Sequence, residues 1–557
     1  MLASSEDIQC HHTSSSCNPH SAQNKNMSTL SSRIHSLSRS LASGAVHLTP
    51  ATTTAWIEGP RANSRLTPPA TGSSTTTRLY SSTSNNAASE EHSLSSKRAQ
   101  RAVQLLPSYL ADARNVEQYH PETAPQGALQ LGVAESKLLE DMLVPALNTP
   151  ISLTPDCIYY QPTHGRPACR QAMASYATTM LDLPPDSLDV DGIVVGAGCN
   201  AVLENMCMCL AEEGEAVMIP TPYYAAFEFD LVARINLHVQ PVQTQTYSMD
   251  EATSESTASS SSDSDSTEAS LNPLNMDPSV YYPTVAALDA AYEQSMQAGH
   301  APKILLLSHP HNPLGVCYPK NVLQECIDWC RANKVHLISD EIYAGSVYKS
   351  NEAGFESILK VASSDNAKKD ETGLGLGPYV HWVYALSKDF ALSGLRVGMA
   401  YSENPAIRVP MQKLNDLCQI SSQTQEWVAA VMKKEVESGK LWPEHFREEN
   451  HKRLRARCEA LQACLEECNI PYLTPTSGLF CWINMSEFLP TEGTDSERER
   501  ALYLELVNEF GLLFTPADSM RNEEPGFFRI VFTAATDEEF NLGLQRLRRF
   551  AAAKGSI

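Results

Sequence analysis

Positive charge is scarce in this chain of 557 residues. Lysine and arginine together number 42, against 65 aspartates and glutamates, and the formal net charge is −23. Nucleic acids and anionic membrane surfaces are themselves negative, so this balance disfavours both as the main partner. The sequence also lacks any run of the roughly 18 apolar residues that a membrane-spanning helix needs. We therefore expect a protein that acts on neither nucleic acid nor membrane.

Cysteine pairs at the spacing of a zinc or redox motif are also missing. The 15 cysteines form an odd number and contain no C-x-x-C pair. Cys326 and Cys330 lie one helical turn apart, as do Cys464 and Cys468, but no histidines stand near them at zinc-site spacing. The sequence thus predicts reduced, mostly buried thiols and no metal site.

Acidic residues are nearly absent from one early segment. Between Met27 and Ala88 the only acid is Glu58, in a background of arginine, serine, threonine and alanine. Such a composition is typical of organellar transit peptides. We expect residues 1–95 to be a disordered, transit-peptide-like segment and the protein to be mitochondrial. The alternative is a cytoplasmic protein with a disordered tail of the same composition.

A second biased tract occupies residues 243–272. It is rich in serine, it contains several acids, and it has no lysine or arginine. Because such a segment cannot bury enough apolar surface to fold, we expect a disordered loop inserted into a folded domain.

Elsewhere the chain alternates short apolar strands with amphipathic helices. Strands are expected at 192–195, 216–219, 303–307, 335–338 and 380–383, and a polar cluster and then a helix follow most of them. This repetition predicts an α/β fold with a mostly parallel sheet and helices on both faces. In such sheets ligands bind beyond the carboxyl ends of the strands. The polar clusters should therefore meet in one pocket.

The cluster after residues 380–383 carries Lys388 and, eight residues later, Arg396. An amine can condense with an aldehyde only when part of its population is deprotonated, which burial and neighbouring cations favour. A guanidinium group binds phosphate through two parallel hydrogen bonds and keeps its charge. The pair suits a lysine that forms a Schiff base and an arginine that binds phosphate. The alternative is a surface turn with two solvated cations, which would show the same residues.

Other strand ends supply the remaining parts of a pyridoxal phosphate (PLP) site. Asp340 is the carboxylate expected at the pyridinium nitrogen. Asn312 and Tyr343 are placed to hydrogen-bond the phenolic oxygen of the ring, and Tyr224 can stack on it. We predict PLP as the cofactor.

Seven segments resemble the class I aminotransferases of fold type I, and within them the 1-aminocyclopropane-1-carboxylate synthase-like branch. The resemblance covers roughly residues 100–550, in the order of the family. The segments are 127–135, 160–167, 220–224, 311–315, 339–343, 387–389 and 524–530.

The resemblance implies roles for individual residues. Lys388 would carry the cofactor and remove the α-proton of the substrate, with Asp340 and Tyr343 as the other catalytic groups. Arg529 would bind the α-carboxylate. The phosphate would be held by Cys199, Asn200, Ser387 and Arg396, and the substrate would also meet Glu135 and Ala134.

The resemblance also implies a homodimer with shared active sites. We expect an N-terminal arm at 96–149, a large PLP-binding domain at 150–410 and a small domain at 411–557, to which the arm contributes. The helix through Leu454 and Leu465 and the strand at 478–483 indicate that the small domain is α+β.

Three departures bear on the reaction. Thr163 replaces a tyrosine that usually reaches the phosphate across the dimer interface, Ala385 replaces a phosphate-binding serine, and Ser136-Lys137 replaces Asn-Gln. Asn200 and Ser387 could take over the lost phosphate contacts. Transamination is the first hypothesis for the reaction at the α-carbon of an amino acid. A synthase-like or carbon–sulfur lyase reaction is the second, and a catalytically silent PLP-binding regulator is the third.

Overall fold

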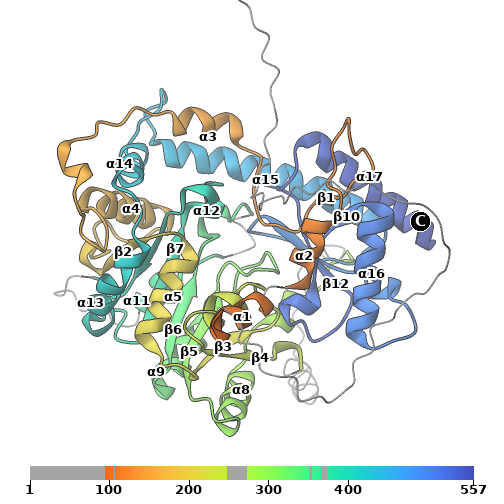
Figure 1. Ribbon diagram of the computed structural model, residues 1–557, viewed down its shortest axis with the longest axis horizontal. Helices are drawn as coiled ribbons and strands as arrows, with labels where there is room; N and C mark the ends of the chain where they lie inside the picture. Colours follow the sequence, from red (N-terminus) through yellow and green to blue (C-terminus); the bar gives the residue numbers. More distant parts are fainter. Residues whose placement is uncertain (1–94, 106, 247–271, 350–353, 365–372, 557) are drawn as a thin grey trace, which may run out of the picture. The chain divides into compact units, whose positions relative to one another are not determined.

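The computed structural model describes residues 95–105, 107–246, 272–349, 354–364 and 373–556 (Figure 1). The transit-peptide-like segment predicted for residues 1–95 lies outside these ranges except for Ser95. None of the helices within them is long and apolar enough to cross a membrane. None of the cysteines within them forms a disulfide, and most are buried.

A seven-stranded sheet forms the centre of the large domain, with the strand order β2-β8-β7-β6-β5-β3-β4. Strand β8 runs antiparallel to β2 and β7, and the other neighbouring pairs are parallel. This confirms the predicted mostly parallel sheet. The bounds are β2 (Ile193–Gly196), β3 (Ala216–Pro220), β4 (His238–Val242), β5 (Pro302–Ser308), β6 (His336–Asp340), β7 (Val380–Ala385) and β8 (Gly398–Tyr401).

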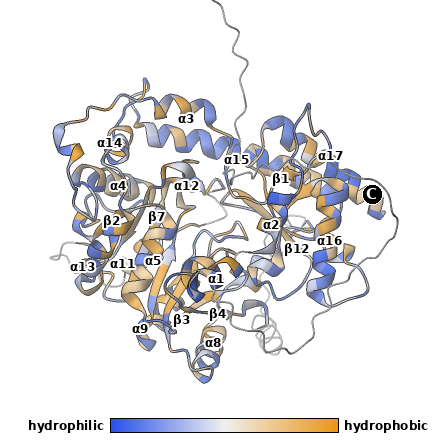
Figure 2. Ribbon diagram, in the orientation of Figure 1, coloured by the Kyte–Doolittle hydropathy of each residue, from blue (hydrophilic) through white to orange (hydrophobic). Residues whose placement is uncertain are grey.

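Helices cover both faces of this sheet because its strands are apolar on both faces. In β5, Ile304 and Leu306 belong to one core cluster while Leu305 and Leu307 belong to the other, as the alternation of a strand requires. Most of the central strands are accordingly rich in hydrophobic residues (Figure 2). The bounds of the surrounding helices are α4 (Pro167–Met180), α5 (Cys199–Leu210), α6 (Phe227–Val232), α8 (Val285–Gln297), α9 (Lys320–Asn333), α11 (Ile358–Ser364), α12 (Leu386–Asp389), α13 (Pro405–Leu414) and α14 (Ser422–Val431).

A three-stranded antiparallel sheet of order β11-β12-β9 lies in the small domain, which is α+β as predicted. The N-terminal arm contributes to it, since β1 pairs in parallel with β10 and Asp112 forms an ion pair with Arg500. The bounds are α1 (Lys97–Gln104), α2 (Ser108–Asn115), β1 (Leu129–Gln130), α3 (Glu140–Leu147), α15 (Trp442–Glu467), β9 (Phe480–Asn484), α16 (Asp495–Phe510), β10 (Leu512–Leu513), β11 (Thr515–Pro516), β12 (Phe527–Val531) and α17 (Asp537–Lys554).

The domain boundaries expected at residues 149 and 410 differ from the packing. The Trp427 indole of α14 donates to the Ala146 carbonyl of α3 (3.0 Å), and both helices pack into the core cluster that contains α4. Helix α3 and helix α14, which follows residue 410, therefore pack with the large domain. Composition does not change at these points, so only the packing partners reveal the assignment.

The ends of the tract predicted to be disordered, residues 243–272, are packed. Thr244 is buried and donates to the Thr221 carbonyl (2.8 Å). The backbone N–H of Gln245 donates to Glu523 (3.0 Å), and Asn272 donates to Glu466 (2.7 Å). The prediction was wrong at these ends because polar composition does not reveal hydrogen bonds to distant residues. Residues 247–271 lie outside the described ranges.

Candidate functional site

The predicted polar clusters meet at the carboxyl edge of the central sheet. Ser308 at the end of β5 pairs in register with Asp340 at the end of β6, which pairs with Val383 of β7. A cavity of about 210 Å³ opens at this edge. Its lining comprises Val133, Glu135, Cys199, Asn200, Leu203, Tyr224, Phe227, Asp230, Ser308, Asn312, Asp340, Ile342, Tyr343, Ser387, Lys388, Ser393 and Arg396.

Lys388 lies in α12, a single helical turn that follows β7 directly. Its Nζ donates to the carbonyl oxygen of Ala134 (2.6 Å). Burial and, to a lesser degree, the positive charge of Arg529 lower the pKa of Lys388 to about 8. Part of the amine population is therefore uncharged near neutral pH, as a nucleophile or base requires.

Asp340 is a buried carboxyl group in the same cavity. One of its oxygens accepts from the backbone N–H of Ile342 (3.2 Å), and the thiol of Cys199 donates to that oxygen (3.6 Å). Burial raises the pKa of Asp340 to about 6, so this carboxyl group exchanges its proton close to neutrality.

Two tyrosines line the cavity with their rings packed edge to face. Tyr343 is buried against Phe480 with 5.2 Å between ring centroids, and Tyr224 lies against Phe227 at 5.3 Å. Burial raises the pKa of both phenols well above its usual value. Both hydroxyls thus remain protonated and available as hydrogen-bond donors.

Arg529 of β12 is only 2% exposed, beside the cavity. Its guanidinium donates to Asn312 Oδ1 (2.7 Å), the Gly132 carbonyl (2.6 Å) and Thr515 Oγ1 (3.2 Å), and Nε is unpartnered. Within the described ranges no carboxylate forms an ion pair with it. A buried cation costs free energy unless an anion compensates it, so this arrangement suits an anionic ligand.

Another part of the cavity lies at the start of α5, where Cys199 and Asn200 follow Gly198. Gly198 has φ 94°, and a Cβ there would lie 2.4 Å from a terminal nitrogen of Arg396. Arg396 is exposed and donates to the Ser393 carbonyl (3.0 Å). A guanidinium beside the N-terminus of a helix forms an environment for phosphate.

Asp230 of α6 also lines this part of the cavity, and the sequence interpretation missed it. The amide of Asn200 donates to Asp230 (2.6 Å) and is thus already engaged. Burial raises the pKa of Asp230 to about 6, although the bond from Asn200 opposes that shift. No motif marks this acid, because only the packing of α6 beside α5 brings it to the cavity.

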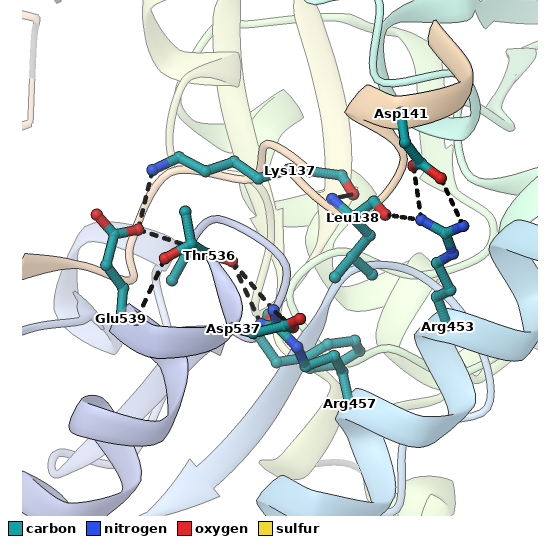
Figure 3. Close-up of polar contacts among 11 residues, drawn as sticks. Lys137, Leu138, Asp141, Arg453, Arg457, Thr536, Asp537 and Glu539 are labelled. Atoms are coloured by element: carbon teal, nitrogen blue, oxygen red, sulfur yellow. Dashed lines mark hydrogen bonds and ion pairs between the residues drawn. The ribbon is translucent and has the colours of Figure 1, made fainter. Parts of the chain in front are cut away.

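Residues 132–139, here called the 132–139 segment, carry Ala134 and Glu135 past Lys388. The segment is tied to the loop before α17, since Thr533 Oγ1 donates to the Glu135 carbonyl (2.5 Å) and the Thr533 carbonyl accepts from Lys137 N (2.9 Å). The Lys137 ammonium also pairs with Glu539 at 3.0 Å (Figure 3).

Arg453 of α15 holds the other end of the 132–139 segment. It donates to the Leu138 carbonyl (2.6 Å) and binds both oxygens of Asp141 (2.7 and 2.9 Å), as Figure 3 shows. Helix α15 and the start of α17 thus fix the position of the segment that carries Glu135.

The structure brings every predicted site residue to the cavity or its immediate rim. Ala134 and Arg529 are at the rim, where Ala134 contributes its carbonyl to Lys388 and Arg529 binds Asn312. The individual roles of these residues remain predictions. Thr163 and Ala385 do not line the cavity: the Thr163 carbonyl accepts from Asn415 (2.5 Å), and Ala385 is buried at the end of β7.

Comparisons with known proteins agree with this geometry. The profile of the family described as aminotransferase class I and II matches residues 130–263 and 274–547. Similar curated proteins include 1-aminocyclopropane-1-carboxylate synthase 1 of Oryza sativa subsp. indica, which is 32% identical over 78% of this chain and 82% of that protein. Another is 1-aminocyclopropane-1-carboxylate synthase 11 of Arabidopsis thaliana, which is 30% identical over 78% of this chain and 86% of that protein.

Solved structures of lower identity share the fold. An aspartate aminotransferase double mutant of Thermus thermophilus is 18% identical with a TM-score of 0.58, covering 82% of this chain and 98% of that one. The aromatic aminotransferase of Pyrococcus horikoshii OT3 is 18% identical with a TM-score of 0.57, covering 82% of this chain and 100% of that one. The chain thus has the architecture of fold type I PLP-dependent enzymes and belongs to the class I and II aminotransferase family.

Proposed function

We propose that this chain binds PLP in the cavity at the sheet edge and transfers the amino group of an α-amino acid. The observation that carries the proposal is the buried guanidinium of Arg529, which has no carboxylate partner among the described residues and lies in the neighbourhood of Lys388. An α-carboxylate would compensate that charge and place the α-carbon near the amine.

The residues fit the cofactor. Arg396 and the start of α5 would hold its phosphate, and Asp340 its ring nitrogen. Tyr343 and the Nδ2 group of Asn312 would hold its phenolic oxygen, because Asn312 Oδ1 already accepts from Arg529. Bound there, PLP would supply an aldehyde for an amine and an electron-withdrawing ring for the α-carbon.

The side chains of the chain itself would bind the substrate and move its protons. Lys388 Nζ, with its pKa lowered to about 8, can accept a proton from the α-carbon and return it at a neighbouring position. Asp340, with its pKa raised to about 6, can keep a proton at the ring nitrogen. Arg529 would orient the substrate through its carboxylate.

A synthase-like reaction is the second candidate, favoured by the curated relatives, which are 1-aminocyclopropane-1-carboxylate synthases at 30–32% identity. It would use the same proton removal but expel a sulfur leaving group. Thr163 favours transamination, since the tyrosine it replaces is tied to the synthase reaction by the resemblance.

One experiment tests both candidates. The purified full chain is loaded with PLP and incubated with a panel of amino acids that includes S-adenosylmethionine, and the mass of the released cofactor is measured. Pyridoxamine phosphate would support transamination and identify the donor. Unchanged aldehyde with consumption of S-adenosylmethionine would support the synthase-like reaction. No cofactor binding would refute both, with Lys388→Ala as the reference for background.

We also propose a homodimer, supported by the loop before α4. Ile158 is 79% exposed and Tyr160 is fully exposed, although the polar groups of the loop bond to one another: Arg166 binds Asp156 (2.7 Å) and Gln161 (2.5 Å). Ordered loops with outward apolar side chains are typical of interfaces. Sedimentation at several concentrations tests this.

We further propose import into mitochondria, on the acid-poor and arginine-rich composition of residues 27–88. A fluorescent protein fused after residue 95 should localise to mitochondria. A fusion that stays in the cytoplasm would refute the proposal.

A further inference from the structure

Asp389 directly follows Lys388 and has no role in the proposed chemistry, yet it is buried. Its carboxylate accepts three hydrogen bonds: from the backbone N–H of Gly345 (2.6 Å), from Ser346 Oγ (2.5 Å) and from the Tyr384 hydroxyl (2.9 Å). No lysine or arginine of the described ranges forms an ion pair with it. Burying a carboxylate that is hydrogen-bonded only by neutral donors costs folding free energy. The position of Asp389 therefore calls for an explanation.

The three donors belong to the two segments that carry the proposed reacting groups. Gly345 and Ser346 lie in the short 3-10 turn η4 (Ala344–Ser346), immediately after Tyr343. Tyr384 lies in β7, which leads into Lys388. The carboxylate of Asp389 therefore ties the turn of Tyr343 to the turn of Lys388 across the sheet edge.

The approach of η4 to this carboxylate is close. A Cβ on Gly345 would lie 2.6 Å from Asp389 Oδ2, so a side chain there would displace the contact. The contact therefore requires glycine at position 345. At position 389 it requires a side chain with two oxygens that both accept hydrogen bonds, which a carboxylate provides.

Helix α15, which the small domain contributes, hydrogen-bonds to the same two turns. Asn450 donates to the Asp389 carbonyl (3.2 Å), and the His451 ring is 2.7 Å from the Gly345 carbonyl. Two adjacent residues of α15 thus contact Asp389 and Gly345, which are themselves joined by a hydrogen bond. Movement of either turn alone would break a bond to α15.

We propose that Asp389 is a positioning residue that fixes Lys388 Nζ relative to Tyr343 through Gly345, Ser346 and Tyr384. The inference rests on the proposed function in so far as Lys388 and Tyr343 are the reacting groups. Asp389 acts through geometry, since the charges with the largest effects on the pKa of Lys388 are those of Arg529 and Glu135.

The test removes two donors and leaves Asp389 and Lys388 in place. In the double variant Tyr384→Phe/Ser346→Ala, α12 should loosen and Lys388 should become better solvated. Burial is the main cause of its lowered pKa, so the amine should titrate at higher pH. The matched control is Tyr401→Phe in the neighbouring strand β8. It removes the hydroxyl of an equally buried tyrosine, which donates to the carboxylate of Glu403 just after the strand (3.0 Å).

The first readout uses the full chain without cofactor. Competitive acetylation of Lys388 across pH, followed by peptide mass spectrometry, should give a midpoint that is higher by about half a pH unit or more in the double variant. Tyr401→Phe should match the wild type. An unchanged midpoint in the double variant overturns the inference, whether or not the chain proves to be a transaminase.

The second readout uses the PLP-loaded chain. The double variant should lose at least about tenfold in kcat with KM within about twofold, because misplacement affects the reacting groups more than substrate binding. Equal losses in Tyr401→Phe would indicate general destabilisation and overturn the inference. If the double variant fails to fold, Tyr384→Phe alone answers the same question by acetylation. Absence of PLP binding in the wild type would refute the proposed function but leave the acetylation result readable.

Discussion

The two ends of the cavity are built differently. At the Lys388 end, Lys388, Asp340 and Tyr343 are enclosed, and Lys388 and Asp340 bond to the backbone. At the Arg396 end, Arg396 is exposed and bonds to one loop carbonyl, while Asn200 is engaged by Asp230. Chemistry requires groups held in place before the substrate arrives, whereas a phosphate ligand can itself organise flexible cations. We infer that the Lys388 end is preorganised and the Arg396 end is completed by its ligand.

The largest effect should follow from removing the amine at the preorganised end. Lys388→Ala should lower the rate of the amino-acid half-reaction by at least about 10³-fold, because no other described amine occupies the cavity. Stopped-flow absorbance of the PLP-loaded chain measures this rate. Lys360→Ala removes an exposed lysine paired with Asp182 and should leave the rate unchanged. A Lys388→Ala variant with near-wild-type turnover would contradict the proposed function.

The next largest effect should come from Arg529. Arg529→Lys keeps the charge but cannot reproduce the fork that binds Asn312, Gly132 and Thr515. We expect about 2–3 kcal/mol of lost substrate binding, which is about 30- to 150-fold in KM. Titration with substrate at fixed enzyme gives KM and kcat separately. A change in kcat alone would mean that Arg529 does not bind the ground-state carboxylate.

The dimer prediction tests whether a partner completes the exposed Arg396 end. Ile158→Ser/Tyr160→Ser removes two outward apolar side chains without touching the Arg166 contacts. Dimer dissociation should increase at least about tenfold, because even one buried apolar side chain contributes roughly 1.5 kcal/mol or more. Sedimentation velocity with PLP fluorescence reads assembly and cofactor retention together. Leu417→Ser, an exposed apolar residue beyond this loop, serves as the comparison. If the double variant keeps both its assembly state and its PLP, this face is not the interface.

A smaller effect is expected at Asp230, beside the proposed phosphate. Its pKa is raised to about 6, so above that pH the carboxylate is charged and repels a phosphate dianion, whereas below it the repulsion disappears. Asp230→Asn should therefore tighten PLP binding about threefold near pH 8 and leave it unchanged near pH 5. The amide oxygen can still accept from Asn200. Fluorescence titration across pH gives the Kd, and equal tightening at both pH values would exclude the charge explanation.

The same contrast explains how far the sequence could be interpreted. Strand-end motifs named Lys388 and Asp340, because local spacing and the parallel sheet together bring them to one edge. Arg529 was named only through the family resemblance, since it lies in β12 of the antiparallel small-domain sheet. Asp230 was missed, since it reaches the cavity only through the packing of α6. The sequence predicted Asn200 as a phosphate ligand and a large domain that ends at residue 410. It did not reveal the bond from Asn200 to Asp230 or the packing of α14 on α3, because both join residues far apart in the chain.

The smallest effect should come from the surface ion pair that links the 132–139 segment to α17. Lys137 and Glu539 are both partly exposed, and such pairs contribute only about 0.2–1 kcal/mol. Lys137→Ala should raise KM about twofold at low salt and have no effect at high salt, where the pair is screened. The backbone bond of Lys137 to Thr533 persists in the variant, so Glu135 should stay near the cavity. Lys554→Ala breaks a similar pair with Glu505, between α17 and α16, and should leave KM unchanged. A salt-independent loss in Lys137→Ala would mean that its stem, rather than its charge, orders the segment, and the Arg453 contacts would then be the principal tie between α15 and the site.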